Sequence, residues 1–124
     1  MNLARRPNVL LVDDEPLVRA AASNLLRDEG CDVFEASAAE PAFALLVEHP
    51  EIDVLFTDLN MPGMDGLDLA CRVRRTHPNL HVILTSGQWE HTGEQAPDGA
   101  VFLQKPYSID SLAQLIKALV KAAT

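Results

Sequence analysis

Four apolar runs of this 124-residue chain are each followed within two residues by a side chain that could take part in chemistry. These side chains are three carboxylates, a hydroxyl and an ammonium, from Asp13, Asp14, Asp58, Ser86 and Lys105. Carboxylates held close together repel one another unless a positive charge lies between them, and their oxygens suit a hard divalent cation such as Mg²⁺. A lysine and a hydroxyl opposite the metal would stabilise phosphoryl oxygens. If the fold brings these residues together, they are suited to phosphoryl transfer.

Asp58 lies in the most informative stretch of the chain, residues 55–66. The apolar run at 52–56 indicates a strand buried on both faces, and the turn-forming residues Pro62 and Gly63 follow it. In an open parallel α/β sheet, ligands bind at the carboxyl ends of the strands. Asp58 is therefore expected at the ligand-binding edge of such a sheet.

Strand and helix signals alternate along the chain. Strands are predicted at 8–12, 32–36, 52–56, 82–84 and 100–103. The first helix begins at Pro16 with an acidic cap before it, the second has a capping box of Ser37 and Glu40, the third covers about 66–76, and Ser108 caps the last. This alternation predicts an α/β fold in which helices cover both faces of a parallel sheet, so that the five side chains above meet at one edge.

Each of these residues also has a plain structural interpretation. Asp13 and Asp14 could cap a helix, Asp58 and Ser86 could open turns, and Lys105 could be a solvated charge. Any one of these interpretations is as good as its functional alternative. Together they require four separate strand ends to supply complementary chemistry by chance, so the joint pattern favours a site.

Composition limits the functional classes. The length fits one domain over residues 1–124, and the net charge of −8 disfavours a nucleic-acid surface. No segment has the apolar length of a membrane span, and the first residues lack a secretion signal, so a cytoplasmic location is expected. Cys31 and Cys71 are expected as free thiols, and His77 and His81 as surface residues because Pro78 separates them.

These residues resemble the response-regulator receiver domain of two-component signalling over nearly the whole chain, from Val9 to Val120. The resemblance rests on Leu11-Val12-Asp13-Asp14-Glu15-Pro16, Thr57-Asp58-Leu59-Asn60-Met61-Pro62-Gly63-Met64-Asp65-Gly66, Leu84-Thr85-Ser86-Gly87 and Phe102-Leu103-Gln104-Lys105-Pro106-Tyr107. It implies a flavodoxin-like (βα)5 fold, a three-layer sandwich whose five-stranded parallel sheet has the order 2-1-3-4-5.

The resemblance also implies a function. Asp58 is the expected phosphoacceptor, taking a phosphoryl group from the phosphohistidine of a sensor histidine kinase or a histidine phosphotransfer domain. Mg²⁺ or Mn²⁺ would be bound by Asp14, Asp58 and the backbone carbonyl of Asn60, with Asp13 acting largely through water. The domain would then control the binding of an unknown downstream protein, and would be a signalling domain and not an enzyme.

Other residues have implied roles in the switch. Lys105 would pair with Asp58 and then with the phosphoryl group, across a cis Lys105-Pro106 peptide bond. Ser86 would hydrogen-bond a phosphoryl oxygen, and Phe102 would move into the space that this shift leaves. The positions that tune hydrolysis of the acyl phosphate are two uncharged polar residues, Asn60 and Gln88.

Residues 88–99 depart from the family pattern. They are fewer than usual and lack a helical apolar stripe, and Gly93, Pro97 and Gly99 oppose a regular helix. Residues 84–89, which include the only tryptophan, Trp89, are similar to the Phe-Ala-Thr-Gly-x-Tyr motif of a variant group of receivers. A short or irregular fourth helix is therefore predicted.

Other classes remain open. A receiver-like binding module that phosphorylation does not regulate is the main alternative. An aspartyl-nucleophile phosphatase is less favoured, because Asn60 stands where that family has a second Asp. A flavin-binding domain is also less favoured, because Asp13 and Asp14 would repel a phosphate after the first strand. The chain is expected to be a stand-alone receiver or one domain of a hybrid kinase.

Overall fold

The computed structural model describes residues 5–61, 64–86 and 98–122. Five parallel strands form the central sheet in the order β2-β1-β3-β6-β7. Their bounds are Asn8–Val12 (β1), Asp32–Ala36 (β2), Val54–Asp58 (β3), His81–Ser86 (β6) and Val101–Gln104 (β7). Numbered among themselves, these strands have the order 2-1-3-4-5, so the predicted flavodoxin-like fold is confirmed.

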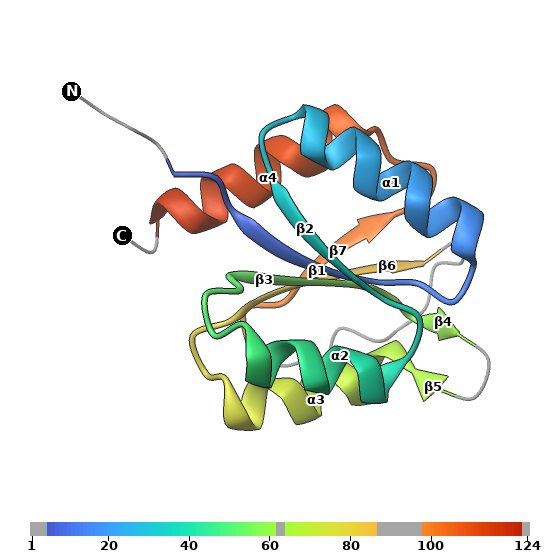
Figure 1. Ribbon diagram of the computed structural model, residues 1–124, viewed down its shortest axis with the longest axis vertical. Coiled ribbons are helices and arrows are strands. Elements are labelled where there is room, and N and C mark those ends of the chain that lie inside the picture. Colours follow the sequence, from blue (N-terminus) through green and yellow to red (C-terminus); the bar gives the residue numbers. More distant parts are fainter. Residues whose placement is uncertain (1–4, 62–63, 87–97, 123–124) are drawn as a thin grey trace.

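In the part of the chain that the structure describes, four helices cover the sheet, two on each face (Figure 1). Their bounds are Pro16–Asp28 (α1), Ala39–Glu48 (α2), Gly66–Thr76 (α3) and Ile109–Ala122 (α4). One core lies under α1 and α4 and contains Val9, Phe56 and Ile83, and the other lies under α2 and α3 and contains Leu10, Leu55 and Leu84. Because neighbouring residues of a strand face opposite sides, these buried strands are apolar at almost every position.

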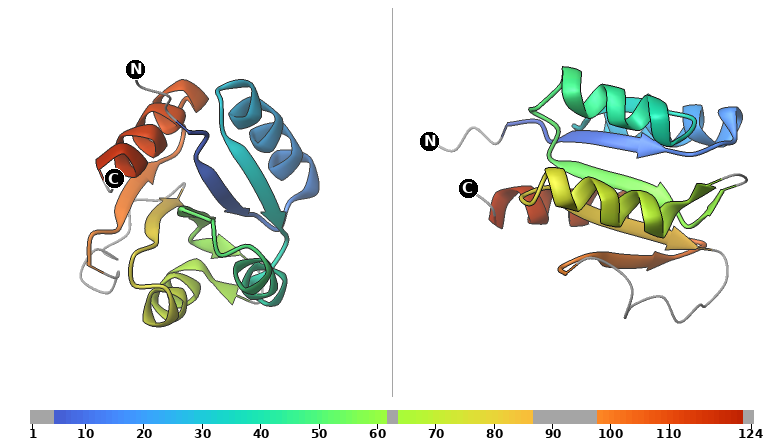
Figure 2. Two further views of the ribbon diagram at one scale, coloured as in Figure 1. Left: turned by 60° about the vertical axis from the view of Figure 1, so that its left-hand side comes forward. Right: turned by 90° about the horizontal axis from the view of Figure 1, so that it is seen from below.

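The strand ends differ slightly from the sequence prediction. β3 begins at Val54 and keeps Asp58 inside the ladder, because Asp58 pairs with Thr85 of β6. Beyond β3, residues Asn60–Met61 (β4) and Met64–Asp65 (β5) form a small antiparallel ribbon where only a turn was predicted. Figure 2 shows this ribbon at the end of the sheet to which the strands point.

One predicted helix cap is wrong, and another is confirmed in position only. Helix α2 is capped by Ala38 and not by Ser37, whereas Glu15 is the N-cap residue of α1 but makes no side-chain capping bond. Instead, the Glu15 backbone N–H donates to the Asp13 carboxylate at 2.9 Å, so the acidic residue that holds this turn is two positions earlier. The Ser108 cap is confirmed, since its hydroxyl accepts the backbone N–H of Ser111 at 3.0 Å.

Other expectations have clear outcomes. Cys31 is buried and Cys71 is half-buried, and neither forms a disulfide bond, as expected. No helix in the described part of the chain is long and apolar enough to span a membrane. The predicted irregular fourth helix, Trp89 and Gln88 lie outside the described residues.

Candidate phosphoryl-transfer site

Asp58 and Lys105 meet at the carboxyl edge of the sheet. Asp58 is the last residue of β3 and is only 9 % exposed. The Lys105 ammonium donates to its Oδ2 atom at 2.6 Å. The Lys105 backbone N–H donates to the carbonyl of Ser86 at 2.9 Å, which ties the lysine to the end of β6. The Lys105-Pro106 peptide bond is cis, as expected.

Asp13 and Asp14 follow β1 at the same edge, and both are half-buried. Burial raises the pKa of the Asp13 carboxyl above its ordinary value, and the hydrogen bond from Glu15 opposes that shift. The charges of Asp58 and Asp14 raise this pKa further, whereas Lys105 lowers it. Asp58 and Asp14 are therefore close enough to disfavour the ionised form of Asp13.

This donor set fits a hard divalent cation. The unfavourable interaction of Asp13 with Asp58 and Asp14 is what a cation placed among them would relieve. Within the described residues, no three His, Cys, Asp or Glu side chains gather closely enough to hold a metal by themselves. Mg²⁺ usually keeps several waters and takes one or two carboxylates, so it does not need such a cluster.

The expected switch residues lie nearby on the two neighbouring strands. Ser86 is the buried last residue of β6, and Phe102 of β7 is 38 % exposed. The backbone of Asn60 lies in β4, directly beyond Asp58, while Gln88 falls outside the described residues. The fold thus brings the ends of β1, β3, β6 and β7 to one edge, as the strand order requires.

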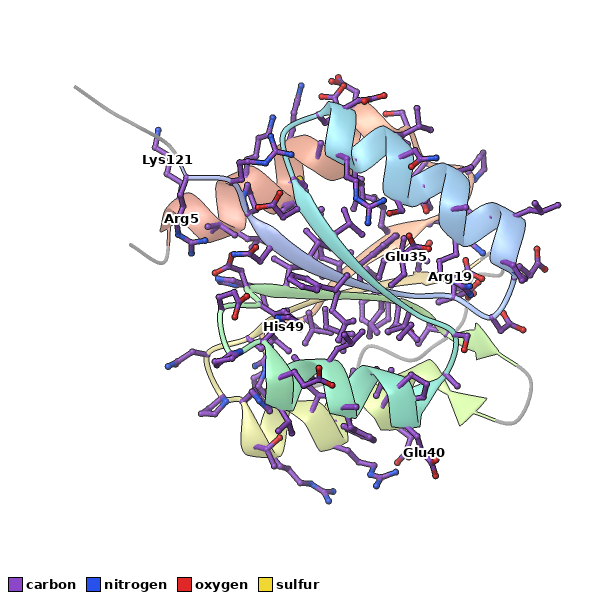
Figure 3. All side chains as sticks on the ribbon, in the orientation of Figure 1. Arg5, Arg19, Glu35, Glu40, His49 and Lys121 are labelled. Carbon is purple, nitrogen blue, oxygen red and sulfur yellow. The ribbon has the colours of Figure 1, made fainter. Side chains whose placement is uncertain are left out.

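Arg19 of α1 supports the loop that carries the two carboxylates. Its guanidinium donates to the backbone carbonyl of Asp13 at 2.8 Å and to the Glu35 carboxylate of β2 at 3.3 Å. Figure 3 shows the Arg19 and Glu35 side chains facing each other between helix and sheet. Sequence reasoning missed this contact, because the two partners are 16 positions apart and no local pattern links them.

Gly66 at the start of α3 was also missed. A Cβ atom at this position would lie 2.1 Å from the backbone carbonyl oxygen of Asp58. The Gly66 backbone N–H donates to the carbonyl of Leu59 at 3.3 Å, so helix and strand end are held together. The available signal was a glycine that opens a helix, where a side chain would usually be favoured.

Tyr107 lies two residues after Lys105 and faces the same edge. Its ring packs edge-on against Phe56, with the centroids 5.7 Å apart. Burial raises the pKa of the Tyr107 hydroxyl, and the charges of Asp13 and Asp58 raise it further. The aromatic ring thus forms part of the low-dielectric wall beside the carboxylates.

A surface groove of about 610 Å³ lies at the opposite edge of the sheet. It is lined by His77 and His81 together with Arg5 and Asp53, where the Arg5 guanidinium donates to both carboxylate oxygens of Asp53. None of the carboxylates at the carboxyl edge lines this groove. It is therefore separate from the candidate site.

Comparison with known proteins identifies the family. A model of the response regulator receiver domain matches residues 9–117. The chain belongs to this family. The receiver domain is 35 % identical, over 124 residues, to the sensor kinase CckA of Brucella abortus, covering 97 % of this chain and 13 % of the kinase.

A transcriptional regulator and a solved receiver domain are also similar to this chain. The DNA-binding transcriptional regulator NtrC of Escherichia coli is 34 % identical over 124 residues, covering 94 % of this chain and 25 % of the regulator. A crystal structure of the receiver domain from the hybrid histidine kinase CckA superposes with a TM-score of 0.78 at 35 % identity, covering 91 % of this chain and 98 % of that one. The receiver domain thus spans a minor part of both curated relatives.

Family membership settles the general class of function. Receiver domains are signalling modules of two-component systems, and they typically bind Mg²⁺. Membership also implies a histidine kinase as a partner.

Proposed function

We propose that this receiver domain accepts a phosphoryl group on Asp58 from the phosphohistidine of a sensor histidine kinase or a histidine phosphotransfer domain. The observation that carries this proposal is the 2.6 Å contact between Lys105 and Asp58 at a sheet edge that also holds Asp13 and Asp14. This contact places a positive charge beside a buried carboxylate at the carboxyl end of β3. The set combines a nucleophile, a fixed positive charge and oxygen ligands for a cation.

The transfer step is a displacement at phosphorus. An Asp58 carboxylate oxygen forms the new O–P bond as the N–P bond of the donor breaks, and the imidazole nitrogen keeps the electron pair. Lys105 moves with the charge, from the Asp58 carboxylate to the phosphoryl oxygens. Asp14, Asp58 and the Asn60 backbone carbonyl would hold Mg²⁺ directly, with Asp13 acting through water. When bound, the cation neutralises charge on the transferred group.

The output is a shift between two conformations. A phosphoryl group adds negative charge and acceptor oxygens at the edge, and Ser86 donates its hydroxyl to one of them. Phe102 is 38 % exposed in the present conformation, so burying it stabilises the phosphorylated one. Asn60 and Gln88 set the access of the water that hydrolyses the acyl phosphate.

The phosphoryl donor docks against helix α1. This helix begins at Pro16, two residues after Asp14, and it exposes three large apolar side chains, from Leu17 (85 % exposed), Val18 and Leu25. A donor that presents a phosphohistidine to Asp58 must cover this end of the sheet. The exposed apolar face of α1 is the adjoining surface that such a partner buries.

The test is the intact mass of the protein after incubation with acetyl phosphate, with and without Mg²⁺, quenched so that acyl phosphates survive. We expect a Mg²⁺-dependent phosphoryl adduct that is lost in Asp58→Asn. The absence of an adduct under every condition would contradict the proposal and favour a binding module that phosphorylation does not regulate.

A further inference from the structure

The hydroxyl of Thr85 is buried without a hydrogen-bond partner in the described part of the structure. Thr85 is 3 % exposed, and its Oγ1 atom is inaccessible to solvent. A buried hydroxyl without a partner destabilises the fold, and valine would fill nearly the same volume without that cost. Such a group in a folded protein calls for a reason, and a role in another state of the molecule is one.

The position of Thr85 suggests that role. Thr85 is in register with Asp58 on β3 and with Leu103 on β7, so it lies between the two strands whose ends carry Asp58 and Lys105. Neighbouring strands are about 4.8 Å apart, so the Lys105 side chain crosses β6 to reach Asp58. Thr85 is the residue of β6 that pairs with Asp58, so the Lys105 side chain crosses β6 close to Thr85.

Thr85 and Asp58 also share a face of the sheet. Ile83 and Phe56, each two residues earlier in its strand, both belong to the core under α1 and α4. Alternation along the strands therefore places Thr85 and Asp58 on that face. Ser86 is two residues after Leu84, which belongs to the opposite core, so Ser86 lies on the opposite face of the sheet. The hydroxyls of Thr85 and Ser86 therefore point to different faces of the sheet.

In the conformation described here, the Lys105 ammonium donates a hydrogen bond to Oδ2 of Asp58 at 2.6 Å. On the proposed function, Lys105 moves to the phosphoryl oxygens after transfer, and the Asp58 oxygen that carries no phosphorus loses this donor. Because Asp58 and Thr85 are in register on one face of neighbouring strands, their side chains are neighbours, and the Thr85 hydroxyl has no partner in the described structure. A rotation of the threonine side chain turns an unpaired hydroxyl into a donor to this oxygen.

We propose that the Thr85 hydroxyl donates a hydrogen bond to the carboxyl of phosphorylated Asp58 and thereby shortens the lifetime of the acyl phosphate. In hydrolysis, a water oxygen forms a bond to phosphorus and the bond between phosphorus and Asp58 breaks. Asp58 keeps the electron pair as a carboxylate, inorganic phosphate leaves, and the water proton passes to phosphate or solvent. A carboxylate accepts a stronger hydrogen bond than an ester carbonyl, so the donor stabilises the transition state more than the ground state.

The experiment compares Thr85→Val, Thr85→Ser and wild type. Each protein is phosphorylated with acetyl phosphate and Mg²⁺, freed of the reagent, and followed by intact mass as the adduct decays. One hydrogen bond of ordinary strength corresponds to roughly a 3- to 10-fold change in rate. We expect Thr85→Val to slow the decay by this factor and Thr85→Ser, which keeps the hydroxyl, to decay as wild type does.

Ser23 supplies a matched control. Its hydroxyl in α1 is also fully buried and has no partner in the described structure. Both Ser23→Ala and Thr85→Val are expected to leave the melting temperature of the free protein unchanged or higher, but only Thr85→Val should lengthen the adduct lifetime. If Thr85→Val does not fold, Thr85→Ala replaces it as the variant without a hydroxyl.

The outcomes separate this inference from the proposed function on which it rests. An unchanged lifetime in the variant without a hydroxyl overturns the inference alone, as does a lifetime in Thr85→Ser that matches Thr85→Val. A wild-type protein that takes up no phosphoryl group overturns both.

Discussion

Replacing Gly66 with alanine tests how closely the start of α3 packs against the end of β3. The new Cβ atom would lie 2.1 Å from the Asp58 carbonyl oxygen, where ordinary contacts exceed 3.4 Å. The atom it meets belongs to the backbone and cannot rotate away, so either α3 or the end of β3 must move by more than 1 Å. Overpacking of this kind costs about 1–3 kcal/mol, and a fixed backbone neighbour places Gly66→Ala at the upper end of that range.

Thermal and denaturant unfolding would measure this cost. For a chain of this length, 1 kcal/mol corresponds to roughly 3–6 °C in melting temperature, so a cost of about 3 kcal/mol should lower that of Gly66→Ala by roughly 9–18 °C. Gly99→Ala is the matched control, because Gly99 has a φ of 81° and nothing within 4 Å of an added Cβ. Its cost is backbone strain alone, about 1–2 kcal/mol.

Comparing the destabilisation of Gly66→Ala with that of Gly99→Ala tests whether the close approach of α3 to β3 matters. If Gly66→Ala is destabilised no more than Gly99→Ala, the close approach of helix and strand does not constrain Asp58. A second readout is the rate of phosphorylation by acetyl phosphate. We expect it to fall in Gly66→Ala at temperatures where the protein is folded, because the displaced strand end carries the acceptor, and to be unaffected in Gly99→Ala.

Three further predictions concern the Arg19 contact, acid stability and donor docking. Arg19→Met should lower the free energy of unfolding by about 1–2 kcal/mol in urea titrations, since it removes the donor to the Asp13 carbonyl; an unchanged midpoint would contradict this. Burial alone would raise the pKa of Asp53, but the hydrogen bonds from Arg5 and a backbone N–H lower it below its ordinary value. Asp53 therefore contributes stability above its unfolded-state pKa, and this contribution is lost as the pH falls through the lower folded-state pKa, so Asp53→Asn should flatten the acid side of the stability curve. Leu17→Asp should slow phosphorylation by a histidine kinase and leave the rate with acetyl phosphate unchanged, and equal effects on both rates would place the donor elsewhere.

The apolar runs were sufficient to predict the sheet. The three inner strands β1, β3 and β6 are buried at almost every position and mainly apolar, so the apolar runs locate them. The convergence of Asp13, Asp58 and Lys105 then follows from parallel strands ending at one edge, and the resemblance to receivers supplied the strand order. The cis bond before Pro106 came from that resemblance as well.

Features that depend on distant contacts could not be predicted. The capping box at Ser37 has the right sequence, but α2 begins after Ala38 and makes no side-chain capping bond. The closeness of Gly66 to Asp58 depends on how α3 returns to the sheet, and the partners of Arg19 lie on two other elements. Local patterns contain no information about such approaches, because they are set by packing between elements.

The buried polar side chains of the sheet lie at the candidate site, whereas the rest of the buried sheet is mainly apolar. In the described structure, the buried polar residues of the sheet are Thr57 and Asp58 at the end of β3 and Thr85 and Ser86 at the end of β6. Burying polar groups is costly, and here that cost is confined to the last two positions of two central strands. A change of charge at Asp58 therefore alters the energy of these ends and leaves the apolar remainder of the sheet unaffected. It follows that substitutions such as Val54→Ala should reduce stability without altering phosphoryl chemistry, whereas substitutions at the strand ends should alter phosphoryl chemistry.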